Sequence, residues 1–272
     1  MVNYDELHRR AREDIEIAIS IWTDILGEES RKVKAAYVKG STIKVWESPI
    51  DYVPFVSDLD IHVHLPEGAS LFHPPDAFHD AMDISEMYEL RFIETHPDHL
   101  HIPRPQVLPV NRLKLHVNYV PPRPGDVRML LGDFEAEPLP DIDTIRRIDR
   151  ENLQQIPEFL ESLPLTVIDR LGIEFWSVIR SMTWRVSPSP VRLLSQIHDD
   201  PVDLWVWNRT SIEELLQEYG YEDLIHSFQG FYMSAWEVFL SDMRSSQAIR
   251  ECVKHGYNLL KGCYEKSKAF GD

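Results

Sequence analysis

The sequence predicts an α+β protein in which a small mixed β-sheet domain precedes an all-α helical bundle. Alternating apolar and polar residues over Val56–Leu65 and Arg112–Val120 predict β-strands in the first half of the chain. In the second half the apolar residues recur at helical spacing, and a segment rich in proline and acidic residues, 121–140, separates the two halves. We therefore expect two domains, 1–140 and 141–272.

The composition limits the expected location of the protein and its expected partners. No run of about 20 consecutive apolar residues occurs and the N-terminus has no signal-like stretch, so we expect no membrane association and a cytoplasmic location. The formal net charge of -17 repels polyphosphate backbones, which makes long nucleic acid a poor candidate partner. Cys252 and Cys263 lie in a predicted helix and are expected to be reduced, packed thiols. The oligomeric state stays open between a monomer and a homodimer.

The first half of the chain is expected to begin with a helix and two strands. Helical spacing of apolar residues predicts a helix over Tyr4–Leu26, and the short apolar stretch Val33–Lys39 predicts a strand that ends in a tight turn at Gly40-Ser41. The second strand, Val56–Leu65, alternates cleanly. One face carries Leu59, Ile61, Val63 and Leu65, and the other carries Asp58, Asp60, His62 and His64.

Further elements follow in order. Asp83–Glu94 predicts a helix, and the proline-rich stretch His96–Pro109 predicts a loop with a short edge strand. Arg112–Val120 is expected to be a third strand, with Leu113, Leu115, Val117 and Tyr119 opposed to Lys114, His116 and Asn118. The bundle is expected to contain helices over Asp143–Leu163, Leu165–Trp184, Pro190–Ile197, Ser211–Tyr219, Tyr221–Asp242 and Ser246–Lys266.

The residues that could carry chemistry lie at the first turn and on the second strand. Gly40 lets backbone amides approach a phosphate, Ser41 adds a hydroxyl donor, and Lys44 could place a positive charge beside the same oxygens. Asp58 and Asp60 project to one side of a strand, where they could share Mg2+ or Mn2+, hard cations that favour oxygen ligands. This set suits a nucleoside triphosphate bound through its phosphates.

Val38-Lys39-Gly40-Ser41 followed by Asp58-Leu59-Asp60-Ile61 resembles the signature of the nucleotidyltransferase superfamily. That superfamily includes DNA polymerase β and the aminoglycoside nucleotidyltransferases of the kanamycin type. The resemblance implies metal-dependent transfer of a nucleotidyl group, AMP from ATP or another nucleoside triphosphate, to a small hydroxylated acceptor with release of pyrophosphate. It gives Asp58 and Asp60 catalytic and metal-binding roles, and it gives Gly40, Ser41 and Lys44 nucleotide-binding roles.

The same resemblance extends to residues whose match is partial. His116 stands where a later strand of the family brings a third carboxylate, and it is either a metal ligand or a structural histidine. Glu174, on the first long helical stretch of the second domain, corresponds to the general base of kanamycin-type relatives, and Arg180 could reach the triphosphate. The gap between Ser41 and Asp58 is longer than usual, with Trp46–Val56 inserted.

Two other functions stay open. With His116 at the third acidic position, the fold could serve as a nucleotide-binding or regulatory module without turnover. It could also nucleotidylate a protein or a tRNA, although the negative charge disfavours tRNA. His62 and His64 are expected to be structural, and the histidines of the proline-rich loop to be solvated: His96, His99 and His101. The tryptophans of the second half are expected to be core residues: Trp176, Trp184, Trp205, Trp207 and Trp236.

Overall fold

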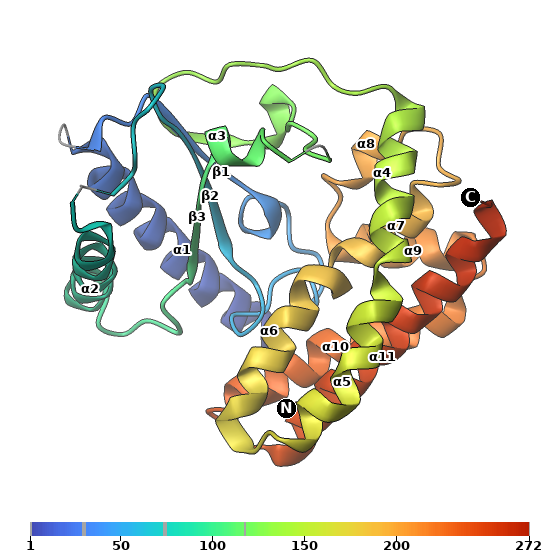
Figure 1. Cartoon of the computed structure of the whole chain (residues 1–272). Helices are drawn as coiled ribbons and strands as arrows, with labels where there is room; N and C mark the ends of the chain where they lie inside the picture. The colour runs from blue at the N-terminus through green and yellow to red at the C-terminus, as the bar shows by residue number, and fades with distance from the viewer. Residues whose placement is uncertain (1, 29–30, 73–74, 117, 272) are drawn as a thin grey trace. The chain divides into compact units, whose positions relative to one another are not determined.

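The computed structural model describes residues 2–28, 31–72, 75–116 and 118–271, which form two compact units. The first unit comprises Met1–Lys44 and Ser57–Leu139, and the second comprises Val45–Val56 and Pro140–Asp272. A small mixed sheet accompanied by many helices confirms the predicted α+β class (Figure 1). The predicted domain boundary places residues 45–56 in the first domain, whereas they pack as part of the second unit.

The first unit contains a sheet with the strand order β3-β2-β1-β4. The strands are β1 (Ala35–Lys39), β2 (Leu59–His64), β3 (Pro105–Pro109) and β4 (Arg128–Leu131). β1 pairs antiparallel with β2 and with β4, whereas β2 pairs parallel with β3. The two strands predicted first along the chain are confirmed, and β3 is the edge strand expected in the proline-rich stretch.

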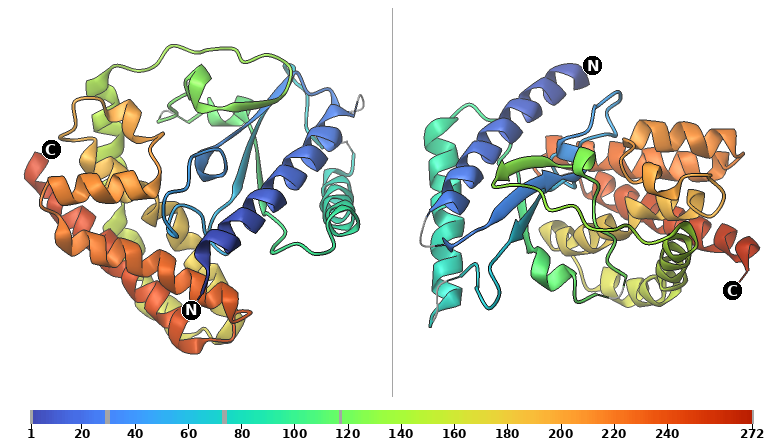
Figure 2. Two further views of the ribbon diagram at one scale, coloured as in Figure 1. Left: turned by 180° about the vertical axis from the view of Figure 1, so that it is seen from behind. Right: turned by 90° about the horizontal axis from the view of Figure 1, so that it is seen from above.

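Two long helices cover the sheet on one side, and Figure 2 shows α2 beside α1. α1 (Tyr4–Gly27) begins at Asn3, whose side-chain oxygen accepts a hydrogen bond from the Glu6 amide at 3.2 Å. α2 (Ala77–Thr95) is capped by Asp76 in the same way. The buried residues of α2 recur at every fourth position, as one inward helix face requires: Ile84, Tyr88 and Phe92.

The predicted third strand, Arg112–Val120, is wrong. The chain turns into the short helix α3 (Val110–Leu113) directly after β3, and Leu115 is 84% exposed. Val117, one of the alternating residues, lies outside the described residues. A strand needs a hydrogen-bonded partner as well as an alternating pattern, and the described residues of this segment pair with none of the four strands of the sheet.

Part of the predicted interdomain connection is also structured. Within residues 121–140 the structure contains a short 3-10 helix, Pro124–Asp126, and β4, which pairs with β1. The four residues of β4 are too few to show alternation, so only the pairing with β1 reveals them as a strand.

The second unit is helical, as predicted. Its helices are α4 (Ile142–Gln154), α5 (Ile156–Ile168), α6 (Phe175–Val186), α7 (Pro188–Leu194), α8 (Pro201–Leu204), α9 (Arg209–Glu218), α10 (Glu222–Leu240) and α11 (Ser246–Ser267). Trp236 and Tyr232 of α10 are fully buried in its core. Cys252 and Cys263 are buried free thiols, as expected. None of the helices in the described ranges combines the length and apolar character that crossing a bilayer requires.

The long gap between Ser41 and Asp58 is part of the core of the second unit. Asp51 is 2% exposed, and its carboxylate accepts hydrogen bonds from Thr210 N at 2.9 Å and Thr210 Oγ1 at 2.8 Å. The Trp236 indole donates to the Pro49 carbonyl oxygen at 2.8 Å. The chain therefore leaves the sheet after the Gly-Ser turn, is anchored among helices, and returns to begin β2.

Candidate functional site

Asp58 and Asp60 lie at the start of β2, on the polar face that the alternation predicts. Leu59 and Ile61 are fully buried, whereas Asp60 is half-buried and Asp58 is 9% exposed. The Leu59 amide donates to the Arg104 carbonyl oxygen at 3.0 Å, which fixes the entry of β2 against the segment leading into β3. The sequence therefore places two carboxylates side by side on one strand, near the end of the sheet where β3 also begins.

Gln106 of β3 joins the two aspartates. It stands opposite Asp60 in the parallel register, so its side chain lies on the same face of the sheet. With its nitrogen turned toward the carboxylates, the amide donates to Asp60 Oδ1 at 3.1 Å and to Asp58 Oδ2 at 3.2 Å. Both carboxylates thus reach one nitrogen atom, which shows that they converge on a common point.

Arg104, two residues before Gln106, forms an ion pair with Asp58. The Asp58 side chain is 8% exposed and the Arg104 side chain 31% exposed, so the pair is partly shielded from water. Together, Arg104 and Gln106 place positive or partially positive groups against both acids. These donors reduce the repulsion between two neighbouring carboxylates.

The Gly40-Ser41 turn lies directly against Asp60. Gly40–Thr42 forms a single 3-10 turn after β1, and Gly40 has φ +84°, a conformation that side chains strongly disfavour. A Cβ atom at position 40 would lie 2.5 Å from Asp60 Oδ2. The absence of a side chain therefore lets the Asp60 carboxylate pack on the backbone of the turn, beside Ser41.

Basic residues support this turn from both ends. Lys39 is opposite Asp60 in the antiparallel register of β1 and β2. Burial lowers the pKa of Lys39, and the charge of Asp60 opposes that shift. Arg12 of α1 donates from one guanidinium nitrogen to the Thr42 carbonyl oxygen and from the other to the Lys44 carbonyl oxygen at 2.9 Å. Lys44 itself is half-buried at the last position of this part of the first unit.

His116 lies after α3, outside the strand that carries the aspartates. It is exposed in a bend after α3, and its amide donates to the Leu113 carbonyl oxygen at 3.0 Å. Among the described residues, no three His, Cys, Asp or Glu side chains are grouped so that they could hold a metal ion. The structure thus brings Asp58, Asp60 and Gln106 together, and the metal-ligand role of His116 stays a prediction.

Glu174 and Arg180 lie in the second unit. The Glu174 carboxylate accepts a hydrogen bond from the Leu171 amide at 2.8 Å and so closes its own 3-10 turn before α6. The Arg180 guanidinium stacks over the ring of Trp184, 4.7 Å from its centroid. Trp184 is 54% exposed, in contrast to its expected core position. The general-base role of Glu174 and the phosphate-binding role of Arg180 stay predictions.

Two other histidines are structural. Burial lowers the pKa of His62 to about 3, with further contributions from Lys39 and His64, and its Nδ1 lies 3.2 Å from the Tyr37 hydroxyl. His101 was expected to be solvated but is 8% exposed, and its Nδ1 lies 2.7 Å from the carboxylate of Asp14. A neutral histidine whose ring nitrogen is paired with a buried partner contributes to the stability of the fold and is not placed to bind a ligand.

Gln106 and Arg104 were missed from the sequence. Gln106 is the single polar residue of the strand Pro105–Pro109. One polar side chain in an otherwise apolar strand indicates that this side chain has a polar partner in the fold. Its register with Asp60 follows only from strand pairing.

The donor set fits a divalent cation. Two carboxylates on one face supply hard oxygen ligands, and the Gln106 amide can present its oxygen in place of its nitrogen by rotation about its last torsion. The nitrogen donors that meet the carboxylates mark the position where positive charge is favourable. Comparisons of this chain with protein-family models, with curated proteins and with solved structures found no match.

Proposed function

We propose that the protein is a metal-dependent nucleotidyltransferase that moves a nucleotidyl group, AMP from ATP, to a small hydroxylated acceptor and releases pyrophosphate. The observation that carries the proposal is the position of the Asp60 carboxylate. It lies between the Gly40 backbone and the Gln106 amide, which it shares with Asp58. A glycine turn next to two converging acids is a combination that suits phosphoryl transfer, because backbone amides can bind phosphate and carboxylates can hold a cation.

In this proposal Asp58 and Asp60 hold Mg2+ or Mn2+. When bound, the cation would neutralise charge on the phosphates and lower the pKa of the acceptor hydroxyl. The acceptor oxygen forms a bond to the α-phosphorus, the bond from that phosphorus to the bridging oxygen breaks, and the electron pair leaves with pyrophosphate. The family resemblance alone would make Glu174 the proton acceptor and Arg180 a triphosphate contact.

In this proposal the residues of the first unit bind the phosphates and the cation. The Gly40-Ser41 turn offers backbone and hydroxyl donors to phosphate oxygens, and Lys44 follows it at the end of the same segment. Arg104 would exchange Asp58 for a phosphate oxygen, because a guanidinium binds both groups with the same planar geometry. Gln106 would rotate its amide so that the oxygen faces the cation.

The test is calorimetric titration of the protein with ATP in the presence and absence of Mg2+. We expect Mg2+-dependent ATP binding in the wild-type protein and its loss in Asp58→Asn/Asp60→Asn. The matched control is Asp5→Asn/Asp24→Asn, which removes two exposed carboxylates of α1 and should bind as the wild type does. Unchanged binding in the Asp58/Asp60 variant would remove the proposal.

A second candidate function is nucleotide binding without turnover. It is favoured by two contacts: an amide, Gln106, meets both aspartates, and Arg104 already pairs with Asp58. Pyrophosphate release measured across a broad set of hydroxylated acceptors distinguishes the two functions. Release that depends on Asp60 supports the enzyme, whereas Mg2+-dependent ATP binding with no release for any acceptor supports the binding module.

A further inference from the structure

The helix α2 carries apolar residues on two sides. Ile84, Tyr88 and Phe92 are buried. Successive residues of an α-helix are about 100° apart, so four other apolar residues lie within about 120° of one another, outside the arc of the buried three. These four form a second apolar face, which we call the outer face of α2. They are exposed: Phe78 (70%), Met82 (54%), Leu90 (53%) and Ile93 (45%).

Two carboxylates lie within the arc of the outer face. Glu86 and Glu89 are exposed, and along the helix axis they separate the N-terminal apolar pair, Phe78 and Met82, from the C-terminal pair. Arg91 is the single Lys or Arg of α2, and it lies outside this arc. The outer face thus has an apolar end, an acidic middle and a second apolar end.

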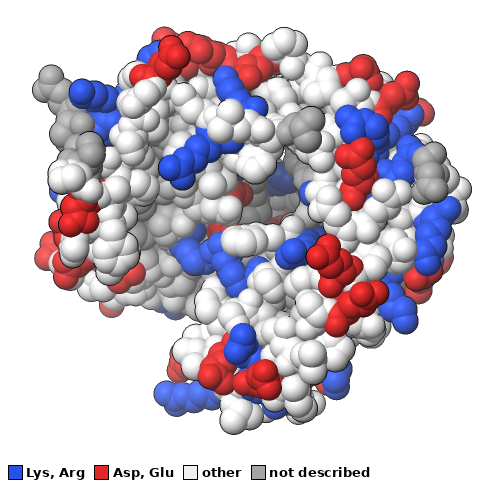
Figure 3. Space-filling model, in the orientation of Figure 1, with Lys and Arg blue, Asp and Glu red and all other residues white. Residues whose placement is uncertain are grey.

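The acidic middle of the outer face has no internal cationic partner. Asp80 of the same helix is paired with Arg31 at 3.3 Å, whereas Glu86 and Glu89 form no ion pair with any residue in the described ranges. Figure 3 shows acidic side chains gathered over this helix. A positive group on a partner would meet two carboxylates here without displacing an existing ion pair.

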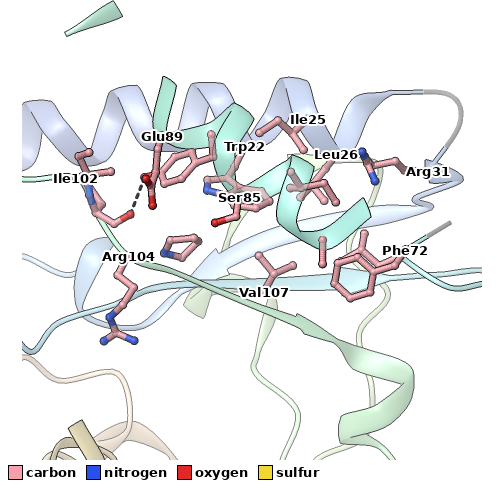
Figure 4. A pocket seen from close by; sticks show the side chains of 16 residues that line it. Trp22, Ile25, Leu26, Arg31, Phe72, Ser85, Glu89, Ile102, Arg104 and Val107 are labelled. Carbon is pink, nitrogen blue, oxygen red and sulfur yellow. Dashed lines mark hydrogen bonds between the residues drawn. The ribbon is translucent and has the colours of Figure 1, made fainter. Parts of the chain in front are cut away.

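A pocket of about 560 Å³ borders the N-terminal end of the outer face. It lies between α1, α2 and β3, and Figure 4 shows the α1 side chains facing Val107 across it. Ala81 and Ser85 line the pocket, and Phe78 and Met82 precede them by three residues, so these side chains are neighbours on the helix surface. The apolar surface therefore continues from the outer face into the pocket, which has room for a large apolar side chain.

The length of the outer face favours a helical segment as its occupant. From Phe78 to Ile93 it spans about 22 Å, which is longer than a small ligand and equals about four turns of a helix. An added β-strand is disfavoured at the neighbouring sheet edge, because Pro105 and Pro109 of β3 have no N–H groups to pair with it. Amphipathic helices bind apolar surfaces through side chains three or four positions apart.

The charge of the outer face selects a basic partner. A second copy of this chain carries the same acidic helix and a net charge of -17, so like charges would meet. Nucleic acid and anionic lipid surfaces are repelled for the same reason. The two arginines on the pocket wall do not change this sign, because Arg31 is paired with Asp80 and Arg104 with Asp58.

We propose that the outer face of α2 binds an amphipathic helix of a partner protein in which two apolar pairs flank central Lys or Arg residues. One apolar pair packs on Phe78 and Met82 and places a side chain in the pocket. The central basic residues meet Glu86 and Glu89, and the second apolar pair packs on the C-terminal end of the face.

The test uses two fluorescein-labelled, alanine-based helical peptides of about 18 residues, long enough to cover the face. The first peptide has leucine pairs at both ends and lysines in the central turns, all on one side of the helix. The second has the same composition, with the leucines central and the lysines at the ends. Attraction by the net charge of the protein is therefore equal for both. We expect fluorescence anisotropy to show one-to-one binding of the first peptide that is at least about tenfold tighter.

Paired variants separate the outer face from the rest of the surface. Phe78→Ser/Ile93→Ser removes one apolar contact at each end and should weaken binding of the first peptide at least about tenfold. The control Leu165→Ser/Ile168→Ser changes two residues of α5 that are each 78% exposed. This control should leave binding within about twofold.

A second pair of variants tests the acidic middle. Glu86→Gln/Glu89→Gln should weaken binding of the first peptide about fivefold. The control Glu158→Gln/Glu161→Gln removes two exposed acids of α5, changes the net charge equally and should have little effect. Circular dichroism checks folding, and the glutamine variants keep the shape and helix propensity of the native residues if the serine variant does not fold. No metal or nucleotide is present, so the result is independent of the nucleotidyltransferase proposal.

Equal binding of the two peptides, or equal losses in the α2 variants and their α5 controls, overturns the proposal, because the protein would then attract cations without a specific face. Two measurements test the other occupants. A dimer in sedimentation velocity that Phe78→Ser/Ile93→Ser abolishes would assign the outer face to a second copy. Binding to phosphatidylglycerol vesicles that the same variant abolishes would assign it to a membrane. Either result also overturns the proposal.

Discussion

Replacing Gly40 by alanine tests the central geometric feature of the candidate site. Two effects add at this position. The backbone has φ +84°, and the new Cβ atom would lie 2.5 Å from Asp60 Oδ2. The first effect strains the backbone, and the second forces the Asp60 carboxylate away from the turn.

The two effects have separate magnitudes. A side chain in the left-handed region costs about 1–2 kcal/mol. A displaced Asp60 also loses the hydrogen bond that Gln106 donates at 3.1 Å, and a hydrogen bond to a charged group contributes about 1.5–3 kcal/mol. Gly40→Ala should therefore lower the free energy of unfolding by about 3–4 kcal/mol. Mn2+ binding should weaken in parallel, because Asp60 is one of the proposed ligands.

Gly68 provides the matched control. It has φ +71°, and nothing lies within 4 Å of its ideal Cβ position, so Gly68→Ala measures backbone strain alone. Urea unfolding followed by tryptophan fluorescence gives both values. In an Asp60→Ala background the cost of Gly40→Ala should fall to that of Gly68→Ala, a double-mutant cycle that isolates the contact. Equal costs for Gly40→Ala and Gly68→Ala in the wild-type background would refute the reasoning.

Three further predictions concern other contacts. Gln106→Glu places a third carboxylate beside the aspartate pair and should raise Mn2+ affinity about tenfold in calorimetric titration, whereas the exposed control Gln154→Glu should leave it unchanged. Asp51→Ala removes the buried acceptor of the Thr210 amide and hydroxyl, so it should lower the free energy of unfolding by about 3 kcal/mol. The control Asp24→Ala, at an exposed position, should lower it by less than about 0.5 kcal/mol. Similar losses in the two variants would contradict the anchoring role of Asp51. His62 binds its proton more weakly in the folded protein, with a pKa of about 3, than in the unfolded chain, with 6.5, so the unfolded chain takes up this proton first as the pH falls. Protonation of His62 in the unfolded chain should therefore lower the free energy of unfolding by about 2 kcal/mol as the pH falls from 7 to 5. His62→Asn does not titrate, so its free energy of unfolding, measured by urea unfolding at pH 7 and at pH 5, should decrease by correspondingly less.

Much of the first unit follows from local patterns in the sequence. The alternation in β2 places Leu59 and Ile61 on one face of the strand and Asp58 and Asp60 on the other, because successive side chains of a strand point to opposite faces. The glycine before Ser41 likewise predicts a turn that no other residue adopts easily, and φ +84° agrees with it.

The same local patterns did not predict which segments pair as strands. Arg112–Val120 alternates, yet none of its described residues joins the sheet, whereas Pro105–Pro109 and Arg128–Leu131 alternate little and do pair. Hydrogen bonds between strands form across large separations in the chain, so periodicity within one segment does not reveal them.

The sequence by itself determined the two acids, their shared face and the turn that precedes them, because neighbouring residues on one strand or turn have fixed relative directions. Only the tertiary structure decided which residues meet those acids. Gln106 and Arg104 reach them through the parallel pairing of β3 with β2, while His116, which the local pattern favoured, is exposed after α3.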